Sequence, residues 1–203
     1  MSGGVAVSRF ITILAFVFLA ANASAQSPND VIQSAADELA VALDGRKDAL
    51  AADKAELYAT IDKILLPRFD RRYAAQLVLG RHWRTASAEQ RDRFIDAFYA
   101  SLLRKYADGV LEFNQDRVEL LPFRGEEVKD RVTVKSIVQL DDGTKVPVNY
   151  GMVRRDVGWL MFDVTIEGIS YVRNFRTELN AEIQAKSLDA VISRLESEMV
   201  ADQ

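Results

Sequence analysis

Residues 158–175 read GWLMFDVTIEGISYVRNF, and the rest of the chain is interpreted outward from this stretch. Its first half is rich in aromatic and β-branched residues and predicts a buried strand, which ends at Gly168. Ile169, Val172, Phe175 and Leu179 then recur at helical spacing. The sequence therefore predicts a buried strand that leads directly into a helical region.

Two segments upstream have the period-two pattern of half-buried strands. In the first, Val128, Val132, Val134, Val138 and Leu140 share one parity and polar residues hold the other. Asp141-Asp142-Gly143 is a hairpin turn, and the next strand carries Val146, Val148, Tyr150 and Met152 on one parity. With a short strand between Arg117 and Phe123, the sequence predicts about four antiparallel strands.

Helical patterns lie before and after these strands. One helix should begin at Ser27-Pro28 and stop near Gly45, and a second should run from about Lys47 until Pro67. A short helix follows from Phe69 to Gly80, and a capping box of Ser87 with Gln90 opens a helix from about Ala88 to Asp108. Ser187 should cap a final helix. Because helices and strands segregate along the chain, the predicted fold class is α+β, with helices packed on one face of a curled sheet.

Residues 1–25 have the pattern of a secretory signal peptide. Arg9 precedes an apolar run from Phe10 to Ala21, and Ala23-Ser24-Ala25 supplies a cleavage site after Ala25. As a helix, the run would span only about 18 Å, which is short of the hydrocarbon core of a bilayer. We therefore expect residues 1–25 to be removed on export and residues 26–203 to form a single domain.

The composition sets several classes of protein aside. The chain has no cysteine, so we expect neither disulfides nor thiolate metal ligands. Its net charge is −4, whereas a dedicated nucleic-acid-binding protein would usually be basic, so we set that class aside. The sequence shows no glycine-rich phosphate loop, no nucleophile elbow and no His-plus-carboxylate metal spacing.

The candidates for catalysis are few. His82 is the only histidine and lies between Arg81 and Trp83, where we assign it no role. Asp163 and Glu167 share a strand parity, but their Cα atoms should lie about 13 Å apart, too far for a pair of carboxylates that act on one bond. Glu167-Gly168 is better explained as the end of the strand and the cap of the next helix. A small-molecule enzyme of the ketosteroid isomerase type, with one buried acid, is the less favoured alternative.

Three segments of the chain resemble the MlaC, or toluene-tolerance, family of exported lipid carriers, and the likeness covers most of residues 26–203. The first runs from Leu66 to Asp70 and continues from Leu77 to Trp83. The second runs from Ala88 to Phe94 and on through Phe98 to Tyr106-Ala107. The third is the opening stretch, where Trp159, Phe162-Asp163-Val164, Ile166-Glu167-Gly168-Ile169-Ser170 and Asn174-Phe175-Arg176 fall in the family's order. Phe175 stands where tyrosine is commoner in the family.

The resemblance implies a function as well as a fold. It implies a periplasmic carrier without catalytic activity, which encloses phospholipid acyl chains between an NTF2-like sheet and its helices and shuttles the lipid between the inner and outer membranes. The implied partners are phospholipid as cargo, an inner-membrane ABC transporter complex with an MCE-type subunit, and an outer-membrane lipoprotein–porin complex. It implies no cofactor, no metal and no nucleic acid. A related branch is associated with hopanoid transport, which is a second alternative.

Apolar residues on the inward faces are the candidate lipid-binding residues. Their periodicity alone fits a filled core as well as a lipid cavity, and the resemblance favours the cavity. The candidates are Leu77, Phe94, Phe98, Leu102, Tyr106, Val132, Val134, Val148, Tyr150, Met152, Leu160, Phe162, Val164, Ile166, Tyr171 and Phe175.

Arginine is concentrated at positions 68, 71, 72, 81, 84, 91 and 93. Solvated helix faces and loops are the commoner explanation of such a run. Arg81 and Arg84 are nevertheless candidates for docking anionic headgroups or an acidic partner near the mouth of the pocket.

Overall fold

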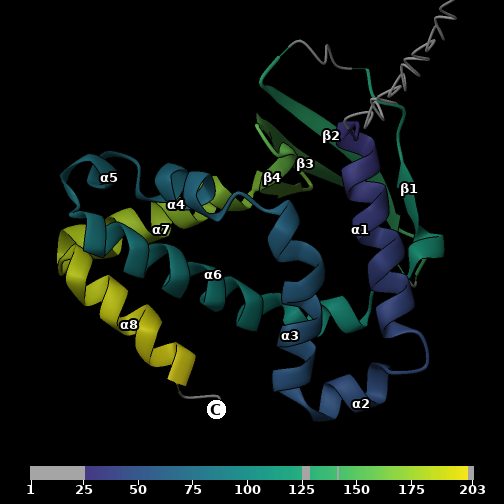
Figure 1. The fold of residues 1–203 in the computed structure, drawn as a ribbon, viewed down its shortest axis with the longest axis horizontal. Helices are drawn as coiled ribbons and strands as arrows, with labels where there is room; N and C mark the ends of the chain where they lie inside the picture. Colours follow the sequence, from purple (N-terminus) through teal and green to yellow (C-terminus); the bar gives the residue numbers. More distant parts are fainter. Residues whose placement is uncertain (1–25, 125–128, 141, 201–203) are drawn as a thin grey trace, which may run out of the picture.

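The computed structural model describes residues 26–124, 129–140 and 142–200. The expected signal peptide and its cleavage site lie outside these residues, as do Val128 and Asp141. Within the described ranges, the chain forms one curled antiparallel sheet and two groups of helices, which confirms the predicted α+β class (Figure 1). None of the helices in this part of the chain has both the length and the apolar character that crossing a membrane requires.

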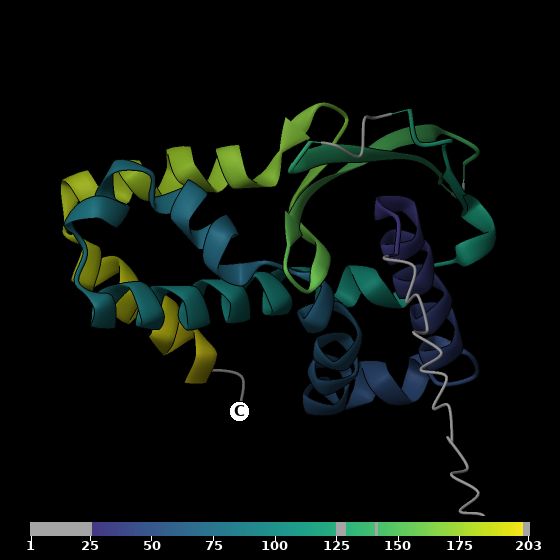
Figure 2. The ribbon, with the colours of Figure 1, turned by 45° about the horizontal axis from the view of Figure 1, so that its top comes forward.

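The sheet is an antiparallel meander whose strands are neighbours in the order of the sequence. Its strands among the described residues are β1 (Val118–Leu120), β2 (Arg131–Gln139), β3 (Lys145–Arg155), β4 (Gly158–Ile166) and β5 (Ile169–Ser170). The expected count of about four was one short, because β5 is a two-residue strand that pairs with the end of β4. The sheet curls over the helix α1 (Pro28–Leu43), as Figure 2 shows.

A tight turn joins β4 to β5. Ile166 pairs with Ile169, and the two residues between them, Glu167 and Gly168, have φ angles of 50° and 84°. Positive φ at both positions is what a two-residue hairpin turn of type I′ requires. The expectation that Gly168 connects the strand directly to a helix was therefore wrong. Ser170 instead caps α7 (Tyr171–Ala185) by accepting a hydrogen bond from the backbone N–H of Arg173.

A β-bulge interrupts the pairing of β3 with β4. Gly151 pairs with Asp163 and the next residue, Met152, pairs with Met161, so Phe162 is the extra residue. Because successive strand residues point to opposite faces, the bulge reverses the parity of the residues before it. Leu160 consequently pairs with Val153 and does not share a face with Val164 and Ile166.

The helices follow the predicted order with three differences. The predicted second helix is divided into α2 (Lys47–Ala52) and α3 (Lys54–Leu65), because the Asp53 carboxylate accepts a hydrogen bond from Glu56 N and begins a new helix. A short helix, α5 (Arg81–Thr85), was not predicted. The helix that begins at the Ser87–Gln90 capping box, α6 (Ala88–Leu111), extends beyond Asp108. The remaining helices are η1 (Leu66–Arg68), α4 (Arg71–Leu79), η2 (Gln115–Arg117) and α8 (Leu188–Val200).

Three clusters of buried apolar side chains hold these elements together. The helices α4 to α8 pack around Phe94, Phe98, Phe175 and Ile192 and form a helical lobe at one end of the molecule (Figure 1). The second cluster joins α1 to the sheet, and the third joins α2 and α3 to the end of α6. The long helix α6 runs from the first of these clusters to the third and so links the lobe to the rest of the molecule.

Candidate functional site

A cavity of about 320 Å³ lies where the helical lobe, the end of β4 and α3 meet. It is lined by Ile61, Leu65, Phe69, Ala74, Phe98, Tyr99, Leu102, Leu103, Tyr106, Ala107, Val110, Met161, Phe162, Asp163, Val164, Ile166, Tyr171, Val172 and Phe175. Asp163 is the one charged residue in this lining. We refer to this space as the apolar cavity.

The helix α6 provides the longest wall of the apolar cavity. Phe98, Leu102 and Tyr106 recur every four residues and form the stripe that the sequence predicts. Tyr99, Leu103 and Val110 form a second stripe beside the first. The sequence analysis missed this second stripe, although its spacing of four and seven residues is visible in the sequence.

Half of the sixteen candidate lipid-binding residues line this cavity. They are Phe98, Leu102, Tyr106, Phe162, Val164, Ile166, Tyr171 and Phe175. They come from α6, which ends at Leu111, and from β4 and α7, which follow one another later in the chain. The structure thus brings together the candidates around the end of β4.

Four further candidates lie on the concave face of the sheet but away from the cavity. Val134 and Met152 belong to the same buried cluster as Val31 and Ile32 of α1. Val132 and Tyr150 are partly buried and pack against this cluster. Val134 and Met152 are fully buried there. The expectation that this part of the concave face lines the pocket is corrected, because α1 occupies it.

The other four candidates also lie outside the apolar cavity. Phe94 stacks on Phe98 inside the helical lobe, with ring centroids 5.4 Å apart, and Leu77 is half-buried on α4. Val148 pairs with Ile166 in the sheet but does not reach the cavity. Leu160 lines a separate surface groove beside Arg154 and Arg155, because the bulge turns it away.

Two tyrosines bring hydroxyl groups to the wall of the cavity without bringing charge. Burial and then the neighbouring Tyr171 raise the pKa of Tyr106 to about 12. Burial also raises the pKa of Tyr99, and the hydrogen bond that its hydroxyl donates to Asp62, 2.8 Å long, adds to the rise. Both phenols are therefore neutral at pH 7. Tyr106 is 36% exposed and its ring meets that of Tyr171 edge to face, so this aromatic pair stands at the rim.

Asp163 has a structural explanation. Its Oδ2 accepts a hydrogen bond of 2.6 Å from the Ser170 hydroxyl, and its Oδ1 accepts one of 3.0 Å from the backbone N–H of Val172. The carboxylate therefore binds the first turn of α7, where a negative charge is favourable. The sequence analysis assigned the capping of this helix to Glu167-Gly168, and the structure corrects that assignment to Ser170 and Asp163.

The described part of the chain gives little support to a catalytic histidine or a metal site. The ring Nε2 of His82 lies 3.0 Å from Oδ1 of Asn180, within the helical lobe and outside the cavity lining. Among the described residues, no group of three histidine, cysteine or acidic side chains could hold a metal ion. What the apolar cavity can do is to remove an apolar chain from water, which is worth about 0.8 kcal/mol per CH₂ group.

Most arginines of the basic run are engaged in contacts within the chain. Arg68, Arg71, Arg72 and Arg93 form ion pairs with Glu38, Asp96, Asp92 and Glu196. Arg91 donates to the Trp83 carbonyl, and the guanidinium groups of Arg72 and Arg91 each lie 5.3 Å from the Trp83 ring. The concentration of arginines is therefore explained largely by contacts within the chain.

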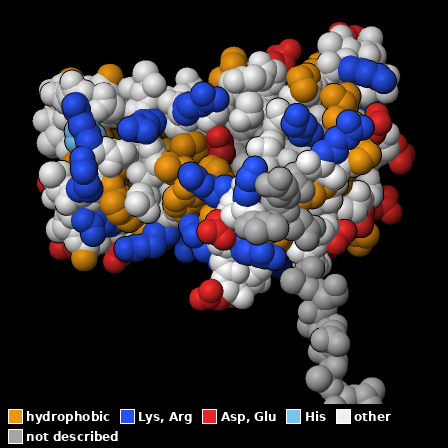
Figure 3. Space-filling view, turned by 90° about the horizontal axis from the view of Figure 1, so that it is seen from above, with side chains coloured by type: hydrophobic (Ala, Val, Ile, Leu, Met, Phe, Trp, Pro, Cys, Tyr) orange, Lys and Arg blue, Asp and Glu red, His pale blue; other side chains and the backbone are white. Residues whose placement is uncertain are grey.

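Arg81 and Arg84 are exposed on α5, at the end of the lobe that lies away from the sheet (Figure 1). They do not line the apolar cavity, so the structure does not place them near its mouth. Lys and Arg side chains extend along the whole face seen in Figure 3, with hydrophobic side chains between them. The docking of a partner by Arg81 and Arg84 stays a prediction.

Comparison with known proteins shows the family of this chain. The model of the MlaC protein family matches residues 33–197. This chain belongs to the MlaC family. The match includes α3, α4, α6, β4 and α7, and hence all the helices and strands that line the apolar cavity.

Two curated relatives within the MlaC family align with nearly the whole chain. The toluene tolerance protein ttg2D of Pseudomonas putida is 26% identical over 89% of this chain and 84% of its own length. The intermembrane phospholipid transport system binding protein MlaC of Haemophilus influenzae is 22% identical over 94% of this chain and 92% of its own length.

A solved structure has the same fold. The phospholipid-binding protein from Ralstonia solanacearum, determined in complex with a phospholipid, superimposes with a TM-score of 0.75 and is 22% identical. The superposition covers 84% of this chain and 96% of that one. The likeness confirms the MlaC-type fold, a curled sheet with helices, that the resemblance implied.

Proposed function

We propose that this chain is a periplasmic phospholipid carrier, which holds acyl chains in the apolar cavity and shuttles lipid between the inner and outer membranes. The observation that carries the proposal is the apolar cavity itself, with a lining in which Asp163 is the one charged residue and is bound to the start of α7. Membership of the MlaC family and the phospholipid bound to the structural neighbour support it.

The physical chemistry of a lipid in water supports an enclosed carrier. Exposing both acyl chains would cost on the order of 20 kcal/mol at about 0.8 kcal/mol per CH₂ group, so free diffusion of the lipid is negligible. The headgroup can stay in water. A cavity of about 320 Å³ is at the lower end of ligand pockets, which span roughly 300–1,000 Å³.

The proposed biological setting follows from the family. Residues 1–25 would direct export and be removed. An inner-membrane ABC transporter complex with an MCE-type subunit and an outer-membrane lipoprotein–porin complex would exchange lipid with the carrier, which would help to maintain the lipid asymmetry of the outer membrane. The name of the Haemophilus influenzae relative, which places that protein in an intermembrane phospholipid transport system, supports this setting.

Mass spectrometry of the gently purified protein tests the proposal. After extraction with organic solvent, we expect close to one diacyl phospholipid per chain. A hopanoid at that ratio would assign the chain to the other cargo, which none of the relatives described above bears in its name. Failure to find lipid, together with failure of the delipidated protein to take up phospholipid from vesicles, would reject the carrier function.

A further inference from the structure

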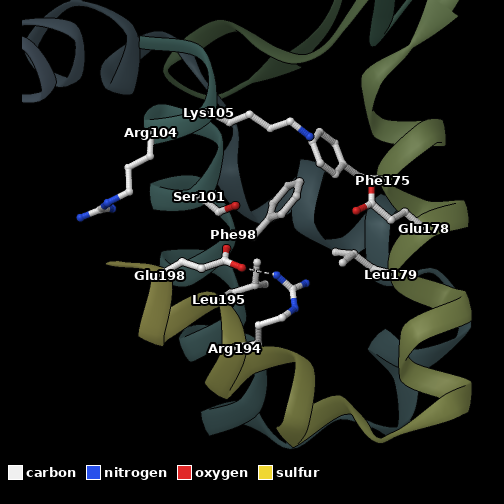
Figure 4. Close-up of a pocket in the computed structure, with 10 residues that line it drawn as sticks. All are labelled: Phe98, Ser101, Arg104, Lys105, Phe175, Glu178, Leu179, Arg194, Leu195 and Glu198. Carbon is white, nitrogen blue, oxygen red and sulfur yellow. Dashed lines mark hydrogen bonds and ion pairs between the residues drawn. The ribbon is translucent and has the colours of Figure 1, made fainter. Parts of the chain in front are cut away.

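A second cavity lies beside the apolar one and is lined by charged and polar groups. This polar cleft, of about 430 Å³, lies between α6, α7 and α8. It shares Phe98 and Phe175 with the apolar cavity, so one layer of aromatic side chains separates the two spaces. Figure 4 shows Ser101, Lys105, Glu178, Arg194 and Glu198 around it.

Arg194 is already committed to partners within the chain. Its Nε and Nη2 donate to the two carboxylate oxygens of Glu182, at 2.9 and 2.8 Å, and its Nη1 donates to Glu198 at 2.6 Å. These contacts fasten α8 to α7. Glu182 also pairs with Lys186 at 3.2 Å, so two cations balance the two carboxylates. Arg194 and Glu198 are therefore walls of the cleft and have little charge left to offer a ligand.

Arg104, which also lines the cleft, donates from Nη2 to the Met199 carbonyl at 2.6 Å. Lys105 and Glu178 are the two remaining charges of the lining. Within the described residues, neither side chain has an oppositely charged group at ion-pair distance. Lys105 Nζ lies 5.2 Å from the centroid of the Phe175 ring and 5.8 Å from that of Tyr106. Lys105 from α6 and Glu178 from α7 both lie beside Phe175 (Figure 4), which places a cation and an anion at the boundary between the two cavities.

The aromatic side chains at this boundary keep the Lys105 ammonium group close to the rim of the apolar cavity. Cation–π contacts of Lys105 hold its ammonium group over rings that also line the apolar cavity. Tyr106, which stands between them at the rim, is neutral at pH 7. The ammonium group of Lys105 is therefore within reach of a molecule that leaves the apolar cavity past Tyr106 and Phe175.

We propose that the polar cleft binds the headgroup of a zwitterionic phospholipid, with its phosphate diester at Lys105 Nζ and its amine-derived cation at Glu178. The inference rests on the proposed function and adds the class of headgroup to it. A phosphate diester accepts hydrogen bonds from an ammonium group, and a carboxylate pairs with the headgroup cation. A phosphatidylglycerol headgroup presents the same phosphate but has no cation for Glu178.

A competition between two lipids with identical acyl chains tests the inference. The delipidated protein is incubated with vesicles of equal parts phosphatidylethanolamine and phosphatidylglycerol, and the bound lipids are counted by mass spectrometry. We expect the wild type to enrich phosphatidylethanolamine by about twofold to fivefold, the range that one exposed ion pair provides. Glu178→Gln should bring the ratio close to one, and Glu178→Lys should reverse it.

Lys105→Gln is expected to act differently, because both lipids carry the phosphate. It should lower the loading of both by about twofold to fivefold and leave their ratio unchanged. Glu119→Lys on β1 and Lys145→Gln on β3 are exposed charge changes far from the cleft in the sequence and in the fold, and they should match the wild type. Circular dichroism checks that every variant is folded.

The outcomes separate this inference from the proposed function. A wild type that loads both lipids while the Glu178 variants leave the ratio unchanged rejects the headgroup site and keeps the carrier. A wild type that loads neither lipid rejects both. Glycerophosphoethanolamine, which has the same headgroup without acyl chains, should not displace bound lipid at an equimolar ratio. Efficient displacement would assign the cleft to a soluble phosphodiester and overturn the inference.

Discussion

Leu102 and Val134 show how much a single apolar residue depends on its neighbours. Both satisfy the periodicity of an inward-facing position, and both were candidates for the lipid pocket. Leu102 is half-buried and forms part of the wall of the apolar cavity, whereas Val134 is fully buried beneath α1. A charge at the two positions should therefore have different consequences.

The first prediction concerns Leu102→Glu. The carboxylate would enter the apolar cavity, so we expect the lipid retained per protein to fall by at least about tenfold while the protein stays folded. Val134→Glu should instead unfold the sheet, with a loss of more than about 4 kcal/mol, because the charge is buried without a partner. Leu140→Glu, at a side chain that is 46% exposed, is the control. Lipid counts and thermal denaturation measure both effects; normal lipid retention in Leu102→Glu would contradict the cavity assignment.

The second prediction concerns acid. The hydrogen bonds from Arg194 hold the pKa of Glu182 below its ordinary value. A lowered pKa in the folded state means that the stabilisation is present above the unfolded pKa of about 4.5 and is lost as the pH falls through the folded value. At pH 7, Glu182→Gln should cost about 1–2 kcal/mol. Between pH 5 and pH 3 the difference between wild type and variant should shrink, which denaturation at each pH would measure. A difference that is constant with pH would show that the pair does not couple to stability.

At the scale of the element, Gly80 tests the backbone that separates α4 from α5, and Gly109 within α6 provides the comparison. Gly80 has a φ of 52°, and a Cβ at this position would lie 2.8 Å from Nε of Arg176. Gly80→Ala should therefore destabilise the protein by about 1–3 kcal/mol. Gly109 in α6 has open space and a helical backbone, so Gly109→Ala should stabilise by about 0.5–1 kcal/mol. Urea denaturation of the two variants should give opposite signs; equal effects would contradict the strain at Gly80.

The elements also show what the sequence could and could not predict. Capping residues such as Ser27 and Ser87 gave the helix starts, because a cap acts through residues three positions away. The bulge at Phe162 was not predicted, since it depends on how β4 pairs with β3, and it reversed the side of Leu160. The packing of α1 on the sheet could not be predicted from the hydrophobic pattern either, because a strand face has the same apolar periodicity whether a helix or a ligand covers it.

At the scale of the whole molecule, the apolar cavity lies between the helical lobe, β4 and α3. A ligand in the cavity should therefore affect the stability of the whole fold. A ligand that binds only the folded state stabilises it by about 2.7 kcal/mol at a hundred times its dissociation constant. Lipid-loaded protein should accordingly melt roughly 5–10 °C above delipidated protein. Scanning calorimetry of the two forms measures the difference, and Leu102→Glu should show none. Equal melting temperatures for loaded and delipidated wild type would mean that the lipid does not lie between these elements.

The packing of α1 beneath the sheet also constrains the order of folding. The helix is made early, yet its contacts with Val134, Met152 and Trp159 require strands that are synthesised much later. The strands can pair locally, because each is hydrogen-bonded to its neighbour in the sequence. Packing the sheet onto α1 instead closes a long loop, which carries an entropic cost. Until that closure, the concave face of the sheet is exposed to solvent. A newly made chain therefore passes through a period in which it is prone to aggregate, and the length of that period is set by how fast α1 packs onto the sheet.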